Sequence, residues 1–404
     1  MTNHDFYQKI LIYLEKLCQE IPERCVGSEG NLKATRFFEA EISALGWETE
    51  MTAFEAIDWK ENGAILKSNG HSFHVLVSPY SLGFKGEAES VSASNVSELE
   101  SLDCSGKIIF LHGEIAKEQL MPKNFVFYNP ERHRKIVALL EKSGAKAIVC
   151  ATGRNSALAG GVYPFPLIED GDFNIPSVYM TEEEGVELLP HIGKTIFLES
   201  VSKRLPSKGY NVIGRKGDRN SKKIVLTAHI DAKKGAPGAI DNATGVIVLL
   251  LLADLLKDYR GDKQIEIVAF NGEDYYAAPG QMNYVMANQD KFKNILLNIN
   301  IDGAGFKTGK SSFSFFDMPE EIQQTANEIL QKFDGITEGI QWPQGDHSIF
   351  LQYGVPAIAV SSKWLIDHLG EQDITHTPKD NMEIVDCNKV VEISQALNSM
   401  IRKI

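Results

Sequence analysis

The chain has 404 residues, of which 43% are hydrophobic and 24% charged, as in ordinary soluble globular proteins. This length allows two domains of ordinary size, or one large domain with an insertion. The net charge of -13 argues against nucleic acid as a partner, because the phosphate backbone attracts basic proteins.

The N-terminal residues favour amphipathic helices over 4–20 and 30–45, followed by a strand over 46–56. The first of these helices lacks the basic region and the cleavage site of a signal peptide. The longest apolar run, 245–256, is too short to span a bilayer and contains Asp254. Five scattered cysteines without a C-x-x-C pair suit a reducing compartment. We therefore expect a cytoplasmic protein with no membrane partner.

Between residues 57 and 200 the sequence changes character. Short apolar runs such as "KIIFLHG" and "KAIVCATG" follow one another closely, with one clear helix over 133–146. This pattern predicts a compact β-rich module inserted into a catalytic domain made of residues 1–56 and 201–404.

From about residue 209 apolar strands alternate with helices. The expected strands are "KKIVLTAH", "QIEIVAFN", "NILLNINID" and "PAIAVSS", and the helix between the first two is the apolar run 245–256. Such alternation predicts a largely parallel sheet that is covered by helices on both faces.

Residues with metal-binding side chains gather where these strands end. In open α/β sheets, ligands collect beyond the carboxyl ends of the strands, which share one edge of the sheet. The first helix starts at this edge, and one more histidine precedes the last helix. The five candidate ligands are His229, Asp241, Asp274, Asp302 and His376. Imidazole and carboxylate donors together suit zinc, with Co2+ or Mn2+ as substitutes.

The number of carboxylates among these candidates favours two Zn2+ per chain, because a single ion would leave them repelling one another. We expect Asp241 to bridge ions ~3.5–4 Å apart. Glu273 precedes a ligand and is the expected general base. Asp231 lies two residues from His229, on the same face of an extended segment, and is expected to accept the second imidazole N–H.

Each of these residues alone has an ordinary explanation, such as a helix cap or a solvated strand end. The coincidence of five candidates at one edge favours the metal site. Asp346, His347 and Tyr275 are further candidates, for substrate binding, although packing roles suit them and Tyr276 equally well. His368 is expected to be solvated.

Seven stretches together resemble, in the same order, the zinc-dependent aminopeptidases of metallopeptidase clan MH. They are "RCVGSEGN" (24–31), "TAHIDA" (227–232), "PGAIDNATGV" (237–246), "FNGEDYYAAPGQMNYV" (270–285), "NIDGAG" (300–305), "GDHSIFLQYGVPAIAV" (345–360) and "THTPKDN" (375–381). The resemblance implies a three-layer α/β/α sandwich with a central mixed sheet. Residues 57–200 resemble a protease-associated domain, which carries no catalytic residues.

The resemblance also implies how the ligands are shared. One metal is held by His229 and Asp302, the other by Asp274 and His376, and Asp241 bridges them. A cis peptide bond is expected between Asp241 and the residue after it, although cis bonds without proline are costly. These implied roles agree with those argued from the strand ends.

The sequence departs from the family pattern at several positions. The pair Glu273–Asp274 stands where Glu-Glu is usual, so the second metal is expected to bind more weakly or at a shifted position. "GDH" stands where "SDH" is common, and "YYAAPGQ" replaces a leucine- and glycine-rich continuation. The residue that stabilises the oxyanion is not identifiable from spacing.

We therefore expect a two-zinc exopeptidase of the aminopeptidase type, in which a water between the metals attacks the N-terminal peptide bond. Peptides are the expected partners, and the sequence is compatible with a homo-oligomer. A carboxypeptidase of the glutamate carboxypeptidase type is an alternative that needs cationic side chains around a C-terminal carboxylate. A glutaminyl cyclase is another, with one zinc. A non-catalytic binding protein is a third reading, against which the retained Glu273 argues.

Overall fold

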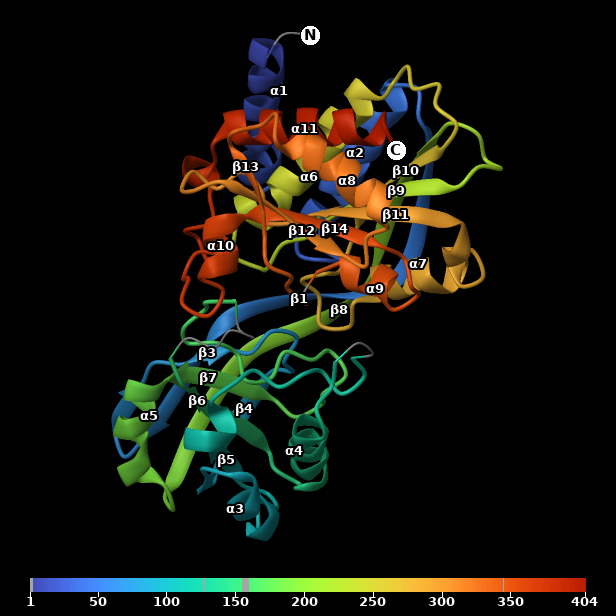
Figure 1. Ribbon diagram of the computed structural model, residues 1–404. Coiled ribbons are helices and arrows are strands. Elements are labelled where there is room, and N and C mark those ends of the chain that lie inside the picture. The colour runs from blue at the N-terminus through green and yellow to red at the C-terminus, as the bar shows by residue number, and fades with distance from the viewer. Residues whose placement is uncertain (1–2, 126–127, 155–159, 344) are drawn as a thin grey trace. The chain divides into compact units, whose positions relative to one another are not determined.

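The structure is a computed structural model that describes residues 3–125, 128–154, 160–343 and 345–404 (Figure 1). It has two compact units. The first comprises residues 1–56, 208–369 and 374–404, and the second comprises 57–207 and 370–373. The second boundary falls after residue 207 rather than 200, because one long strand, β8 (Thr195–Lys216), runs through it. A protease-associated identity for the second unit stays a prediction.

The first unit is built on a mixed sheet with the strand order β13-β12-β14-β11-β9-β10-β8. Besides β8, its strands are β9 (Lys223–His229), β10 (Gln264–Phe270), β11 (Ile295–Ile301), β12 (Ser311–Phe316), β13 (Ile336–Glu338) and β14 (Ala357–Ser362). Strands β9, β10, β11 and β14 are parallel to their neighbours in the middle of the sheet. Strands β12 and β8 pair antiparallel on either side of them, so the sheet is mixed, as predicted.

Helices cover both faces of this sheet (Figure 1). On one face lie α1 (Asn3–Glu15), α2 (Glu29–Ala44), α6 (Thr244–Leu255), α8 (Glu320–Leu330) and α11 (Cys387–Ile401). On the other lie α7 (Pro279–Asn288), α9 (His347–Leu351) and α10 (Lys363–Asp367). Short helical turns occur at Lys16–Glu20, Ala239–Ala243, Phe292–Asn294 and Met382–Ile384. The predicted three-layer α/β/α sandwich is confirmed.

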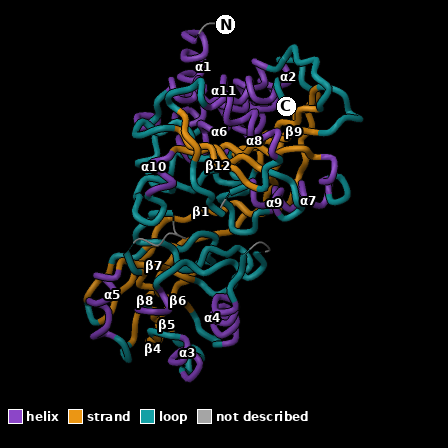
Figure 2. The backbone as a smooth tube through the Cα atoms, viewed as in Figure 1, coloured by secondary structure: helices purple, strands orange, loops and turns teal. Residues whose placement is uncertain are grey.

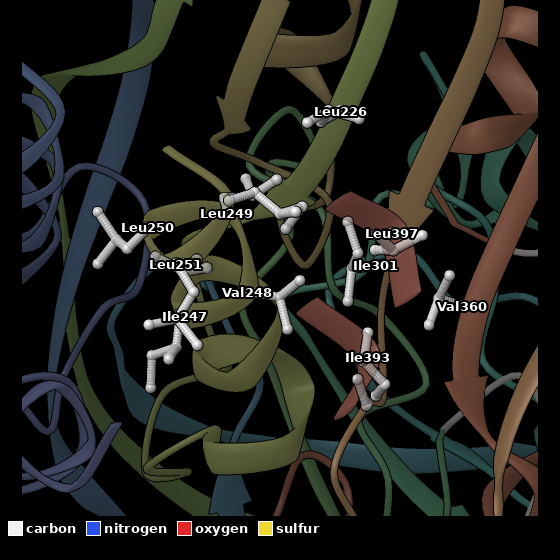
Figure 3. Close-up of a cluster of buried hydrophobic side chains, with 14 of the residues drawn as sticks. Leu226, Ile247, Val248, Leu249, Leu250, Leu251, Ile301, Val360, Ile393 and Leu397 are labelled. Carbon is white, nitrogen blue, oxygen red and sulfur yellow. The ribbon is translucent and has the colours of Figure 1, made fainter. Parts of the chain in front are cut away.

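The main core lies between the sheet and α6 (Figure 3). Every residue of this helix from Thr244 to Asp254 is buried, which explains why its sequence is apolar on all sides. Successive residues of β14 alternate between faces, with Ile358 and Val360 in this core and Ala357 and Ala359 in the core beneath. The sheet is thus buried on both sides.

The second unit contains a sheet with the strand order β8-β4-β5-β6-β7-β3. Figure 2 shows that both units are rich in strands. The other elements of the second unit are β1 (Glu48–Ser68, shared with the first unit), β2 (His71–Phe73), β3 (Leu76–Val77), β4 (Phe84–Ala93), β5 (Ile108–Leu111), β6 (Ala147–Thr152), β7 (Ser177–Thr181), α3 (Val96–Ser101), α4 (Glu131–Lys142) and α5 (Glu182–Leu188), with short turns at Gly113–Ala116 and Leu189–His191. Among the described residues of the whole chain, none forms a helix of the length and apolarity that a bilayer crossing requires.

Candidate metal centre

Three neighbouring parallel strands bring the predicted residues to one edge of the sheet. Strand β9 ends at His229, which is level with Phe270 at the end of β10. Strand β11 pairs with the other side of β9, and Asp302 follows its last residue. The parallel register therefore places the histidine, the loop after β10 and Asp302 side by side.

All five predicted ligands meet at this edge, and Asp241 lies at their centre. Its Oδ1 is 3.1 Å from His229 Nε2, and its Oδ2 is 3.1 Å from His376 Nε2. Asp302 Oδ1 lies 3.7 Å from His229 Nε2, and Asp274 Oδ1 lies 2.9 Å from His376 Nε2. The geometry thus pairs His229 with Asp302 and His376 with Asp274, with one carboxylate between the pairs.

The charges of this cluster are strongly coupled. Burial lowers the pKa of both imidazoles, but the surrounding carboxylates outweigh it, so the pKa values of His229 and His376 lie well above the ordinary range. Burial raises the pKa of Asp241, but the two imidazoles outweigh it and hold that pKa below its usual range. Burial raises the pKa of Asp302. Without a metal, protons on the two imidazoles offset part of the charge of the three carboxylates.

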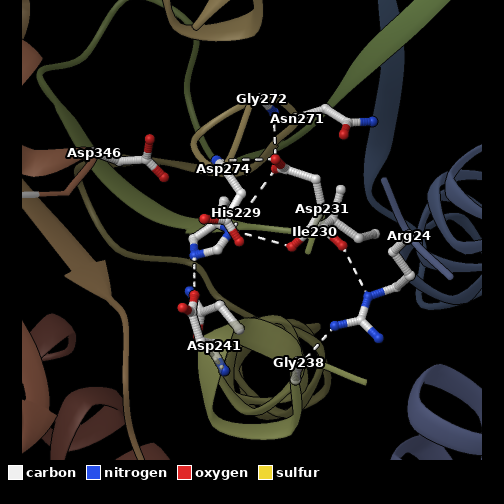
Figure 4. A network of polar contacts seen from close by, with 12 residues as sticks. Arg24, His229, Ile230, Asp231, Gly238, Asp241, Asn271, Gly272, Asp274 and Asp346 are labelled. Atoms are coloured by element: carbon white, nitrogen blue, oxygen red, sulfur yellow. Dashed lines mark hydrogen bonds and ion pairs between the residues drawn. The ribbon is translucent and has the colours of Figure 1, made fainter. Parts of the chain in front are cut away.

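The residues present fit zinc. Asp274 Oδ2 is buried and has no hydrogen-bond partner among the described residues, which is costly unless a cation or water satisfies it. One donor atom from each of His229, Asp241 and Asp274 lies within 4.8 Å of the others. Two imidazoles and three carboxylates are the nitrogen and oxygen donors of zinc sites, and Figure 4 shows part of this set.

Glu273 follows β10 directly before the ligand Asp274 and is half-buried. Burial raises its pKa well above the ordinary value, and the neighbouring charges of Asp274, Asp302 and Asp346 add to this, although His229 opposes it. A carboxylate with a raised pKa beside a metal cluster is suited to accept a proton.

The Asp231 carboxylate lies beside the His229 imidazole, as expected, and makes two further contacts. It accepts the main-chain N–H groups of Gly272 (2.7 Å) and Asp274 (3.0 Å), as Figure 4 shows. His229 Nδ1 lies 3.2 Å from the main-chain oxygen of Asp231 and 3.7 Å from its Oδ1. His229 Nδ1 therefore faces Asp231, with the main-chain oxygen nearer than the carboxylate, and the carboxylate also binds the loop that carries Glu273.

The predicted cis peptide bond between Asp241 and Asn242 is confirmed. Asn242 donates its side-chain N–H to the carbonyl of Ile301 (2.8 Å) and accepts the N–H of Gly245 (3.0 Å). A Cβ at Gly245 would meet Asn242 Oδ1 at 2.3 Å and the Ile301 carbonyl at 2.5 Å, so only glycine fits. The stretch "NATG" therefore ties the start of α6 to the end of β11.

The candidates for substrate binding are buried. Asp346 accepts a hydrogen bond from Gln281 (2.8 Å) through Oδ1, while its buried Oδ2 has no hydrogen-bond partner among the residues that the structure describes. Burial raises the pKa of Asp346 to about 7. His347 Nε2 lies 3.0 Å from the carbonyl of Trp342, and burial lowers its pKa to about 4, so it is neutral.

The rings of Tyr275 and Tyr276 lie 4.5 Å apart and are buried, as packing residues would be. The expectation of a solvated His368 is wrong: it is half-buried, stacks on Trp364 at 4.5 Å, and its Nδ1 lies 2.7 Å from the Trp364 carbonyl.

Two buried charged residues near the centre were missed by the strand-end argument, although both lie in stretches that it had noticed. Asp380 follows His376 in "THTPKDN", and burial together with the charge of Asp241 raises its pKa to about 7. Arg24 lies in "RCVGSEGN" and is completely buried. The signal that could have identified them is a charged residue that lies inside one of these stretches but away from any strand end.

Comparison with known proteins places this geometry in a family context. Residues 211–401 match the profile of peptidase family M28. The chain is 26% identical to the aminopeptidase YwaD of Bacillus subtilis over 275 residues, which are 65% of this chain and 57% of that protein. It is 23% identical to the probable lipoprotein aminopeptidase LpqL of Mycobacterium tuberculosis over 291 residues, 69% of this chain and 54% of that protein. The chain therefore spans little more than half the length of these curated relatives.

Solved structures show the same fold over nearly the whole chain. The aminopeptidase from Aneurinibacillus sp. strain AM-1 has a TM-score of 0.75 at 22% identity, with 99% of this chain and 93% of that chain covered. BSAP, a zinc aminopeptidase from Bacillus subtilis, has a TM-score of 0.76 at 20% identity, with 98% and 94% covered.

Proposed function

We propose that this protein is a zinc-dependent aminopeptidase with two metal ions per chain, and the match of residues 211–401 to peptidase family M28 supports the proposal. The observation that carries the proposal is the placement of Asp241 between two imidazoles, each with a further carboxylate beside it. One ion would be held by His229 and Asp302, the other by His376 and Asp274. Asp241 would be shared between them.

When bound, zinc would polarise the scissile carbonyl and lower the pKa of a water molecule toward neutrality. Glu273 accepts the proton of the attacking water and delivers it to the leaving amine. Its raised pKa suits both halves of this transfer. Asp231 holds the loop that carries Glu273 through the N–H groups on either side of that residue.

The first experiment measures zinc per purified chain together with cleavage of free and N-acetylated short peptides. Two zinc ions and cleavage of free N-termini alone would support the proposal. Cleavage of acetylated peptides from the C-terminus would favour a carboxypeptidase instead. One zinc with cyclisation of N-terminal glutamine would favour a glutaminyl cyclase, and neither zinc nor cleavage would favour a binding protein.

A further inference from the structure

Asp380 binds three consecutive main-chain N–H groups in the segment that carries the central ligand. Its carboxylate accepts the N–H of Ile240 at 2.7 Å through Oδ1 and that of Asp241 at 3.0 Å through Oδ2. Its main-chain carbonyl accepts the N–H of Ala239 at 3.2 Å. The side chain is completely buried, so these bonds form away from water, where each is expensive to lose.

Arg24 binds the residues that precede these N–H groups. The guanidinium donates to the carbonyls of Pro237 (2.7 Å) and Gly238 (2.8 Å), which directly precede the N–H groups bound by Asp380. It also donates to the carbonyl of Ile230 (3.0 Å), the residue after His229, as Figure 4 shows in part. The carbonyls of the segment are thus bound by the Arg24 guanidinium, and its N–H groups by Asp380.

Asp380 is also tied to a second ligand. It lies four residues after His376, and its N–H bonds to the carbonyl of Thr377 at 3.1 Å in a tight turn. The Thr377 hydroxyl in turn donates to the carbonyl of Ile374 at 2.7 Å, across His376. Residues far apart in sequence are therefore joined by one buried carboxylate.

We propose that Asp380 is a positioning residue for the metal centre. Its hydrogen bonds fix Asp241 relative to His376. This role rests on one part of the proposed function, namely that the site binds zinc. Asparagine at position 380 would keep one acceptor oxygen but would direct an NH2 group at a main-chain N–H, so one ligand segment would be released. Groups that orient metal ligands typically change metal affinity by ~10–100-fold when they are removed.

The test compares zinc affinity, measured by competition with a chelator, in the full-length protein and its Asp380→Asn variant. We expect the variant to bind zinc at least ~10-fold more weakly. Asp254→Asn is the matched control, because Asp254 is another buried carboxylate, at the far end of α6, whose partners are Lys9 and Lys257. It should lower the melting temperature and leave zinc affinity within about twofold of the parent. Asp380→Glu, which retains both acceptor oxygens, should lose less affinity than Asp380→Ala.

Equal zinc affinity in Asp380→Asn and the parent would overturn the inference. If the variants do not fold, amide hydrogen exchange on the metal-free parent decides instead. The N–H groups of Ile240 and Asp241 should then be protected like those of the central strands, and rapid exchange would overturn the inference. Because zinc binding is read without a substrate, a parent that binds zinc but cleaves no peptide would contradict the proposed function alone.

Discussion

At the scale of single residues, the centre depends on how one carboxylate is shared. Each oxygen of Asp241 faces a different imidazole, and both distances are 3.1 Å. The shorter side chain of Asp274, in place of the usual glutamate, still reaches within 2.9 Å of His376. The main-chain N–H of Asp274 bonds to the Asp231 carboxylate, and the expectation of weaker or shifted binding of the second metal stays a prediction.

Glu273→Gln tests the proposed base directly. The amide keeps the shape of the side chain but cannot accept the proton, so we expect kcat to fall by ~10²-fold or more. Zinc content should stay unchanged, because Glu273 is not among the expected ligands. Near-normal turnover in a fully metallated variant would rule out this role.

The raised pKa values of His229 and His376 predict a pH dependence of zinc binding. Since both pKa values lie above 6.5 in the metal-free protein, both imidazoles remain protonated as pH rises past that value, and zinc must displace their protons. Affinity should therefore rise with pH until it passes the raised pKa values, and fall as pH decreases. Titration calorimetry in buffers of different ionisation enthalpy should detect proton release, and an affinity unchanged between about pH 6 and 8 would contradict the prediction.

At the scale of elements, buried polar pairs hold the loops that follow the strands. Asn31 at the start of α2 and Asn271 after β10 exchange side-chain hydrogen bonds at 2.7 and 2.9 Å. Asn31 also donates to the carbonyl of Arg24 (2.9 Å). The N-terminal stretch "RCVGSEGN" thus supports the ligand segments without supplying a ligand, which explains its presence among the matching motifs.

The junction of α6 with β11 gives a prediction at this scale. Gly245→Ala forces a methyl group against Asn242 and the Ile301 carbonyl, so it should lower the free energy of unfolding by ~1–3 kcal/mol and also weaken zinc binding. Leu249→Ala in the same helix is the control. It should cost ~2–5 kcal/mol through the cavity in the core of Figure 3, with zinc binding kept. Chemical denaturation and chelator competition measure the two effects, and equal zinc affinity in both variants would contradict the link.

At the scale of the whole molecule, the first unit is assembled from three separate parts of the chain. Its supporting residues come from both ends, with Arg24 and Asn31 before the second unit and Asp380 near the C-terminus. Every predicted ligand lies in the first unit, within residues 208–369 and 374–404. The metal centre should therefore stabilise this unit rather than the other.

Removal of zinc tests that expectation. A ligand at 100 times its Kd stabilises the folded state by ~2.7 kcal/mol, so chelation should lower the melting temperature clearly. Differential scanning calorimetry should show the shift in the transition of the first unit, and a separate transition of the second unit should not move. A shift confined to the second unit would place the metal elsewhere.

Elements with a clear local pattern or motif could be predicted from the amino-acid sequence. Apolar strands alternating with helices predicted the covered sheet, because the spacing of apolar residues along each element shows which of its faces are buried. The strand ends predicted the candidate ligands, since the carboxyl ends of parallel strands share an edge. Short elements such as β13 and α10 gave no such signal, because they have too few residues to show a period.

The hydrogen-bond partners of those residues became known from the three-dimensional structure. Asp231 lies beside His229 as its spacing suggests, but its carboxylate also binds the main-chain N–H groups of Gly272 and Asp274, a contact that the spacing did not indicate. The link from Asp380 to Asp241 spans 139 positions. Every residue except proline has the same main-chain N–H, so the sequence does not show which of these groups a buried carboxylate binds. That depends on how distant segments pack.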